Sequence, residues 1–168
     1  MTLPLKPKRG GFLRQFGCAW FIREFLAGNA PYGSPIIVPA IGAPQSDIFY
    51  CYKQALREIT AMDRATGAET KAARKDKRPI DPNKITNLYQ IYLRRTPYKA
   101  NGCRYHSFVV YFSNLQRLGW VEPSGTVELS AFQGNYPSGQ PRKYFRLTAA
   151  GKSASDSAWA NPLSALYR

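Results

Sequence analysis

The sequence predicts a mainly α-helical chain with a small antiparallel β-hairpin near its C-terminal end, which is an α+β fold class. Amphipathic helix patterns with start signals occupy most of the first two thirds of the chain. The residues after Gly119 change to short runs rich in β-forming side chains. The length of 168 residues fits one compact domain with extra elements, and 11 Tyr, 9 Phe and 3 Trp supply enough apolar surface for a core.

The first half carries two predicted helices separated by an extended connection. Residues 1–10 form a basic, Pro-bearing arm that we expect to be flexible. Residues 11–27 show apolar side chains at helical spacing, whereas Pro and Gly recur through 28–46 and predict an extended segment. Asp47 is a good N-cap for a helix over 47–66, whose apolar face has three- and four-residue spacing. That face consists of Ile48, Tyr52, Ala55, Leu56, Ile59 and Met62.

The polar stretch 68–78 is either a solvated tail of that helix or a basic loop. We expect residues 11–80 to form an N-terminal helical extension that covers the core or makes a dimer interface.

A further helix starts at Asp81-Pro82, where an Asp cap precedes Pro at the first helical position, and it closes at Thr96-Pro97. Its expected buried face consists of Ile85, Leu88, Tyr89 and Tyr92. The Asn101-Gly102 turn then leads to a helix over 105–118, which stops at Gly119.

Three short strands follow, at 120–123, 126–132 and 142–147, the last of them rich in β formers. Thr148 can cap a last helix over 149–159, and residues 159–168 form a C-terminal tail.

The chain has 24 Lys+Arg against 10 Asp+Glu, a formal net charge of +14. This surplus makes a polyanion the first partner to consider, and nucleic acid comes before an anionic membrane. No Asp or Glu lies between Asp81 and Glu122, while six Lys or Arg do. A surface that binds phosphates must lack negative charge, and this stretch contains no carboxylate side chain.

The sequence carries no pattern of an enzyme. There is one His, no phosphate-binding glycine loop and no pair of acids that suggests hydrolysis. The three cysteines, Cys18, Cys51 and Cys103, are widely spaced, so neither a disulfide framework nor a zinc site is predicted. We therefore expect a non-enzymatic protein without metal or cofactor.

Pro and Gly interrupt the longest uncharged run, 25–46, so it does not predict a membrane-spanning helix. Charged residues interrupt the apolar stretch 11–27, unlike a secretory signal. We expect a cytoplasmic, nucleoid-associated protein that is neither secreted nor in contact with a membrane.

Two segments in the second half form a recognisable pair. The first runs from Leu115 to Gly119-Trp120-Val121-Glu122, and the second from Tyr144-Phe145 to Leu147-Thr148 and Gly151. In this order they resemble the second half of a winged helix-turn-helix domain, of the kind in MarR- and PadR-like transcription regulators. There a recognition helix is followed by a β-hairpin wing. The resemblance covers residues 81–158 and implies a winged helix-turn-helix domain that binds duplex DNA, preceded by the N-terminal extension.

The 105–118 helix has one apolar stripe, made of Phe108, Tyr111, Phe112, Leu115 and Leu118. The opposite face is polar and free of carboxylates, and side chains of these types can reach base edges in a major groove. It presents Ser107, Val110, Ser113, Asn114 and Arg117, with His106 near the groove entry. The resemblance implies that Lys99 and Arg104 clamp phosphates before the helix. Arg142 and Lys143, at the wing base, would meet phosphate or the adjacent minor groove.

The leading interpretation is a transcription regulator that binds double-stranded DNA as a homodimer. The alternative is a nucleoprotein that coats or packages DNA or RNA without sequence choice, for example of viral or plasmid origin. The positive charge in both halves of the chain, +6 over 1–81 and +8 over 82–168, favours that alternative. A protein-interaction module with a winged fold is a third possibility, since fold alone does not determine function.

Overall fold

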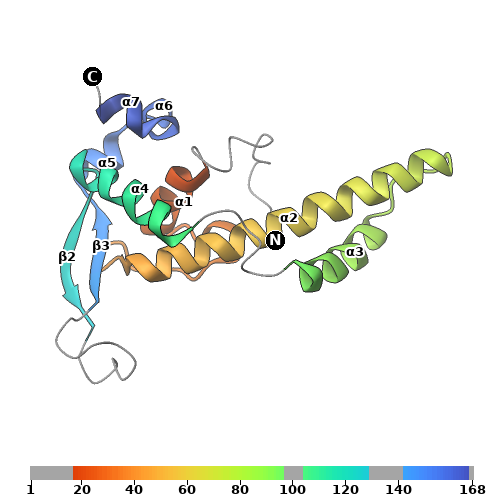
Figure 1. Cartoon of the computed structure of the whole chain (residues 1–168), viewed down its shortest axis with the longest axis horizontal. Coiled ribbons are helices and arrows are strands. Elements are labelled where there is room, and N and C mark those ends of the chain that lie inside the picture. The colour runs from red at the N-terminus through yellow and green to blue at the C-terminus, as the bar shows by residue number, and fades with distance from the viewer. Residues whose placement is uncertain (1–16, 97–103, 129–141, 167–168) are drawn as a thin grey trace. The chain divides into compact units, whose positions relative to one another are not determined.

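The computed structural model describes residues 17–96, 104–128 and 142–166. The arm 1–10, Lys99, the Asn101-Gly102 turn and the predicted strand residues 129–132 lie outside this part. The described chain is mostly helical with one three-stranded antiparallel sheet, as the α+β fold class predicts (Figure 1).

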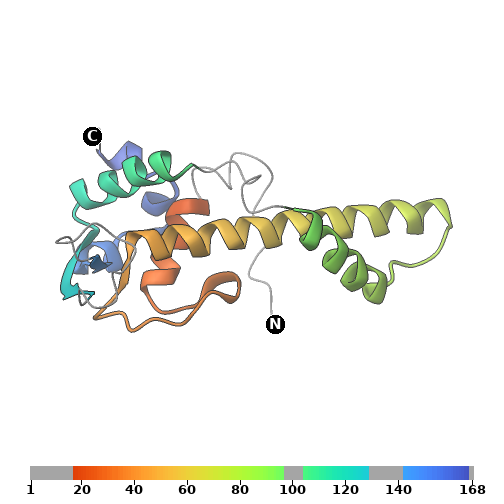
Figure 2. The ribbon, with the colours of Figure 1, turned by 60° about the horizontal axis from the view of Figure 1, so that its bottom comes forward.

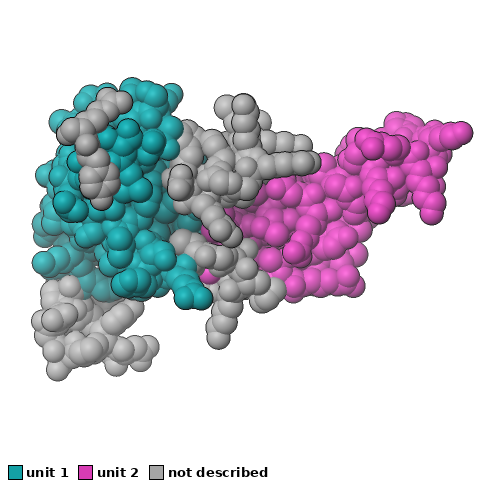
Figure 3. Space-filling view, turned by 45° about the horizontal axis from the view of Figure 1, so that its top comes forward, with its two compact units in different colours: residues 1–52, 103–168 teal, residues 53–102 magenta. Residues whose placement is uncertain are grey.

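The chain divides into two compact units, coloured separately in Figure 3: unit 1 comprises residues 1–52 and 103–168, and unit 2 comprises residues 53–102. This division differs from the predicted boundary at 80/81. The helix that starts at Pro82 belongs to unit 2, not to the unit that holds the 105–118 region.

Unit 1 contains most of the elements. They are α1 (Gly17–Leu26), η2 (Pro31–Gly33), β1 (Ala43–Pro44), the start of α2 (Gln45–Lys75), α4 (Tyr105–Arg117), β2 (Val121–Val127), β3 (Lys143–Leu147), α5 (Ala149–Ser153), α6 (Asp156–Ala160) and α7 (Pro162–Leu166). The helices predicted over 11–27 and 105–118 are confirmed where the structure describes them.

The sheet has the order β1-β3-β2, with both pairs antiparallel. The prediction of two strands over 120–123 and 126–132 is wrong in its division, because β2 runs through Val127 with an irregularity after Pro123. Gly125, at φ +88°, lies in this irregularity and takes a backbone conformation that glycine adopts without strain.

Strand β1 was not predicted, and it depends on Gly42. A Cβ atom there would lie 1.6 Å from the carbonyl oxygen of Phe145, so only glycine lets the chain approach β3 this closely.

A chain of aromatic rings joins α1, α2, α4 and β3. Successive ring centroids lie 5.1–6.5 Å apart, in the order Phe25, Phe21, Tyr52, Phe108, Phe112 and Phe145. All six side chains are buried. Large rings in mutual contact contribute much of the stability of a small core, so this chain fixes α4 from one side.

The C-terminal region differs from the predicted helix over 149–159. Thr148 caps α5 as expected, since its Oγ1 accepts from the N–H of Gly151 at 3.0 Å. The chain is extended at Ala154, and Ser155 caps the separate helix α6. The break lets Trp159 reach back, and its Nε1 donates to the carbonyl of Gly151 at 3.0 Å.

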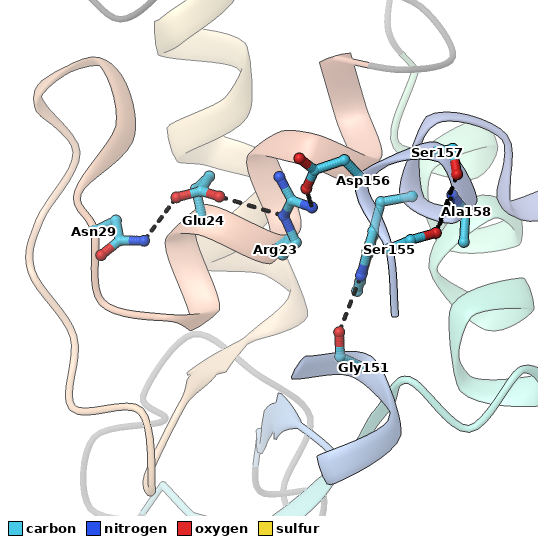
Figure 4. Close-up of polar contacts among 9 residues, drawn as sticks. Arg23, Glu24, Asn29, Gly151, Ser155, Asp156, Ser157 and Ala158 are labelled. Atoms are coloured by element: carbon cyan, nitrogen blue, oxygen red, sulfur yellow. Dashed lines mark hydrogen bonds and ion pairs between the residues drawn. The ribbon is translucent and has the colours of Figure 1, made fainter. Parts of the chain in front are cut away.

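Figure 4 shows how α1 meets this region. One arm of the Arg23 guanidinium lies 2.8 Å from Asp156 on α6, and its Nε lies 3.3 Å from Glu24. Arg23 also lies over the ring of Trp159, at 5.9 Å from its centroid. The residues predicted as a C-terminal tail, 159–168, include α7, which contacts α4.

Unit 2 consists of the remainder of α2 and helix α3 (Pro82–Arg95), which turns back along it (Figures 1 and 2). The predicted start of α3 is confirmed, because Asp81 accepts from the N–H of Asn83 with Pro82 at the first position. Its predicted buried face is only half-buried, and no described residue of α3 is fully buried.

The preceding helix is longer than the predicted bounds 47–66, and the alternative that the stretch 68–78 is a solvated tail of that helix is confirmed as far as Lys75. Helix α2 begins at Gln45, with Asp47 inside its first turn, and continues through Gly67 to Lys75. Part of the reason is Glu69, whose buried carboxylate is held by both arms of Arg78 at 2.8 and 2.9 Å and by the N–H of Asp81 at 2.7 Å. These bonds tie the end of α2 to the start of α3.

Candidate nucleic-acid interface

Helix α4 is fixed through one face. Phe108, Phe112 and Leu115 are buried, and each is at most 1% exposed. Gly119, at φ +74°, ends the helix and turns the chain into β2. The predicted apolar stripe is confirmed for these three residues, whereas Tyr111 and Leu118 are half-buried.

The opposite face of α4 lies on the surface of unit 1. His106, Ser107, Val110, Ser113 and Arg117 are exposed, and Asn114 is half-buried. At 100° per residue these six positions fall within an arc of roughly 120°. Helix α4 contains no carboxylate. The structure therefore brings together all six predicted residues of this helix on one accessible, carboxylate-free face.

The two halves of the sequence pattern meet in space. The N–H of Thr148 donates to the carbonyl of Trp120 at 3.0 Å, and its hydroxyl donates to the carbonyl of Gly119. A Cβ on Gly151 would lie 2.2 Å from the carbonyl oxygen of Trp120, so glycine is needed where α5 crosses the start of β2. Both glycines of the pattern thus have a local structural reason.

The predicted phosphate contacts differ in their surroundings. Arg104, at the N-cap of α4, and Lys143, the first residue of β3, are both exposed. Lys99 lies outside the described residues.

Arg142 is half-buried and engaged by two carboxylates. Its guanidinium donates to Glu128 through two nitrogens and to Asp47 at 2.8 Å, and it also bonds Ser46 at 3.0 Å. The hydrogen bonds with Arg142 lower the pKa of Glu128, and the same pairing raises the pKa of Arg142. A phosphate at this position competes with two anions already in place. Sequence reasoning missed this pairing, although Asp47 and Glu128 are among only ten acids in the chain.

Tyr105 has no predicted role. Its side chain is 48% exposed, and its ring packs edge-on against that of Phe49 with the centroids 5.1 Å apart. An exposed aromatic at the first position of a helix was the available signal.

Within the described ranges, no group of three or more His, Cys, Asp or Glu side chains is placed to hold a metal ion. Cys18 is buried. Burial, together with the charge of Asp47, raises the pKa of Cys51 to about 11, so that thiol stays protonated near neutral pH.

Comparison of the chain with protein families, curated proteins and solved structures found no significant match. Among the described helices, none combines the length and the apolar character needed to cross a bilayer.

Proposed function

We propose that unit 1 is a winged helix-turn-helix domain that binds duplex DNA through the outward face of α4 and the β2–β3 hairpin. The proposal is carried by one observation, the outward face of α4. Six residues, none of them Asp or Glu, lie on one side of this helix, and its other side is buried in an aromatic core. Because the core fixes this helix before binding, little conformational entropy is lost when its outward side chains enter a DNA groove.

The order of elements within unit 1 supports this proposal, but with a different first helix of the motif from the one predicted from the sequence. The first turns of α2 supply a helix that packs on α4, since Phe49 and Tyr52 contact Phe108 at ring distances of 5.2 and 6.5 Å. The hairpin that follows α4 carries the wing. In this interpretation residues 53–102 are an insertion between the last two helices of the motif.

The chemistry of the face suits base recognition. Asn114 can pair with adenine and Arg117 with guanine, while Val110 can contact a thymine methyl group. Among the described residues, neither Arg117 nor Lys143 takes part in an ion pair, so their charges are available to phosphate. A two-fold homodimer, which we also propose, doubles these contacts and is tested by sedimentation.

The test is selection from randomised duplexes, followed by anisotropy titration at one fixed salt concentration. We expect Asn114→Ala and Arg117→Ala each to weaken binding to the selected duplex by about 1–3 kcal/mol. Gln116→Ala, on the same helix but off the face, is the matched control and should change little. Lys143→Ala should weaken binding to all sequences alike.

The ratio between selected and random duplex separates the two main functions. A ratio of roughly 10³ or more indicates a regulator, and a ratio near one indicates a nucleoprotein that coats DNA or RNA. Unchanged binding in both α4 variants would refute the assigned face.

A further inference from the structure

Helix α3, in unit 2, exposes a second surface that lacks negative charge. Its fourteen residues contain no Asp or Glu, and none of them is buried. The exposed side chains are amides, a hydroxyl and cations with one large apolar residue among them. They are Pro82, Asn83, Lys84, Thr86, Asn87, Gln90, Ile91, Arg94 and Arg95.

Two of the three cations of α3 are aligned along the helix. Lys84 and Arg95 are eleven residues apart, so at 100° per residue they point in nearly the same direction, whereas Arg94 lies roughly 80–100° around the helix from them. A rise of about 1.5 Å per residue separates Lys84 from Arg95 by about 16 Å. That length equals the rise of about five base-pair steps along the axis of B-DNA.

Two arginines of unit 2 outside α3 are engaged within the unit. Arg78 holds Glu69, and Arg57 donates to the carbonyls of Leu93 and Thr96, both at 2.7 Å. Across the described ranges no ion pair or hydrogen bond involves the side chains of Lys84, Arg94 or Arg95. They are free to bind an external anion.

Stability of the helix does not account for all three cations. Arg94 and Arg95 lie in the last turn, where positive charge interacts favourably with the helix dipole. Lys84 lies in the first turn, where the same dipole is unfavourable to it. Lys84 does help to lower the pKa of Glu69, but that carboxylate already accepts bonds from Arg78 and Asp81.

We propose that the exposed face of α3 binds the phosphate backbone of nucleic acid, as a second contact surface that is independent of sequence. The proposal rests on the proposed function for the presence of nucleic acid, but it uses other residues in the other unit. Amide and hydroxyl side chains interleaved with cations suit hydrogen bonds to phosphate oxygens. An anionic membrane is the less suitable partner, because a helix that lies on a bilayer needs a broad apolar face and α3 exposes only Ile91.

The experiment compares two triple variants of the full chain that each remove three exposed cations. Lys84→Ala, Arg94→Ala and Arg95→Ala together alter α3. Lys71→Ala, Arg74→Ala and Lys75→Ala together alter the exposed end of α2 and serve as the charge-matched control. Affinity for a random duplex is measured between 50 and 200 mM salt, together with the ratio of selected to random duplex and helix content by circular dichroism.

We expect the α3 variant to lose about tenfold or more in affinity for random duplex near 0.1 M salt. Its slope of log affinity against log salt should fall by about 2 to 3, at roughly 0.9 per phosphate contact. The ratio of selected to random duplex should stay unchanged, and the α2 control should lose less than half as much slope.

An unchanged salt slope in a folded α3 variant, or an equal loss in the α2 control, overturns the proposal. Loss of binding to phosphatidylserine vesicles without loss of duplex binding would assign the surface to a membrane instead, and also overturns it. The proposed function fails differently, through the absence of any effect of the α4 variants on the ratio.

Discussion

Replacing Gly151 even by alanine should destabilise unit 1, although Gly151 lies in helix α5 and alanine is the better helix former. An added Cβ at this position would lie 2.2 Å from the carbonyl oxygen of Trp120, 3.0 Å from its carbonyl carbon and 3.1 Å from its Cα. All three atoms are backbone, so no rotamer change relieves the contact. The distance of 2.2 Å from the Cβ to the carbonyl oxygen is about 0.8 Å shorter than 3.0 Å, the lower limit of Cβ contacts in proteins.

The expected net cost follows from opposing contributions. Overpacking a fixed site costs about 1–3 kcal/mol. Displacing the carbonyl of Trp120 also weakens the bond that it accepts from Thr148, a further loss of about 1 kcal/mol. Replacing glycine in a helix recovers about 1 kcal/mol. We therefore expect Gly151→Ala to lower the free energy of unfolding of unit 1 by about 2 kcal/mol.

The assay can observe unit 1 by itself, because Trp20, Trp120 and Trp159 all belong to it. Urea unfolding is followed by tryptophan fluorescence for unit 1 and by circular dichroism for total helix. Gly67→Ala is the control for placing alanine in a helix, since a Cβ there meets nothing within 4 Å, and it is followed by circular dichroism because Gly67 belongs to unit 2. It should raise stability by about 0.5–1 kcal/mol. Equal or greater stability of the Gly151→Ala protein would refute the argument from close approach.

Three other substitutions test the packing and the polar contacts. Phe108→Ala should lower the free energy of unfolding of unit 1 by about 3–5 kcal/mol in the fluorescence assay, because it removes the central ring of the aromatic chain; a loss below 1 kcal/mol would contradict that position. The hydrogen bonds from Arg78 and from the N–H of Asp81 lower the pKa of Glu69 to about 2. The stability they supply is therefore present above pH 4.5 and is lost as the pH falls toward 2, and Glu69→Gln should flatten this acid limb of the circular dichroism signal. Arg57→Ala should increase hydrogen exchange in the last turn of α3, where two carbonyls lose their donor, and exchange unchanged from the wild type would count against this capping.

The elements that local signals define were predicted well. Asp81 and Pro82 start α3, Gly119 ends α4, and Thr148 caps α5, because each depends on bonds within a few residues. The face of α4 was also predictable, since the spacing of Phe108, Phe112 and Leu115 leaves only one side for solvent.

What was missed depends on contacts between distant residues. Strand β1 contains only Ala43 and Pro44 and has no β-forming pattern, yet the approach of Gly42 to Phe145 creates it. Helix α2 was predicted to end at residue 66, but the bonds that Glu69 accepts from Arg78 and Asp81 stabilise its continuation.

The placement of α3 could not be read from chain order. Neighbouring helices in sequence were expected to form one motif, whereas bonds from Arg57 and to Glu69 join α3 to α2 within unit 2. Arg142 likewise has the composition of a phosphate ligand, and only the fold brings Asp47 to it across 95 residues.

The discontinuity of unit 1 has a consequence for how the chain finds its native state. The rings of Phe49 and Tyr105 pack edge-on with their centroids 5.1 Å apart, although residues 53–102 separate the two stretches to which they belong. Closing so long a loop costs chain entropy before any contact between the stretches repays it. Helices α2 and α3 can pair early, because contacts such as Glu69–Arg78 join residues close in sequence. Their pairing shortens the flexible loop that must close before Phe49 meets Tyr105. We therefore expect early pairing of α2 with α3 to speed assembly of the aromatic core.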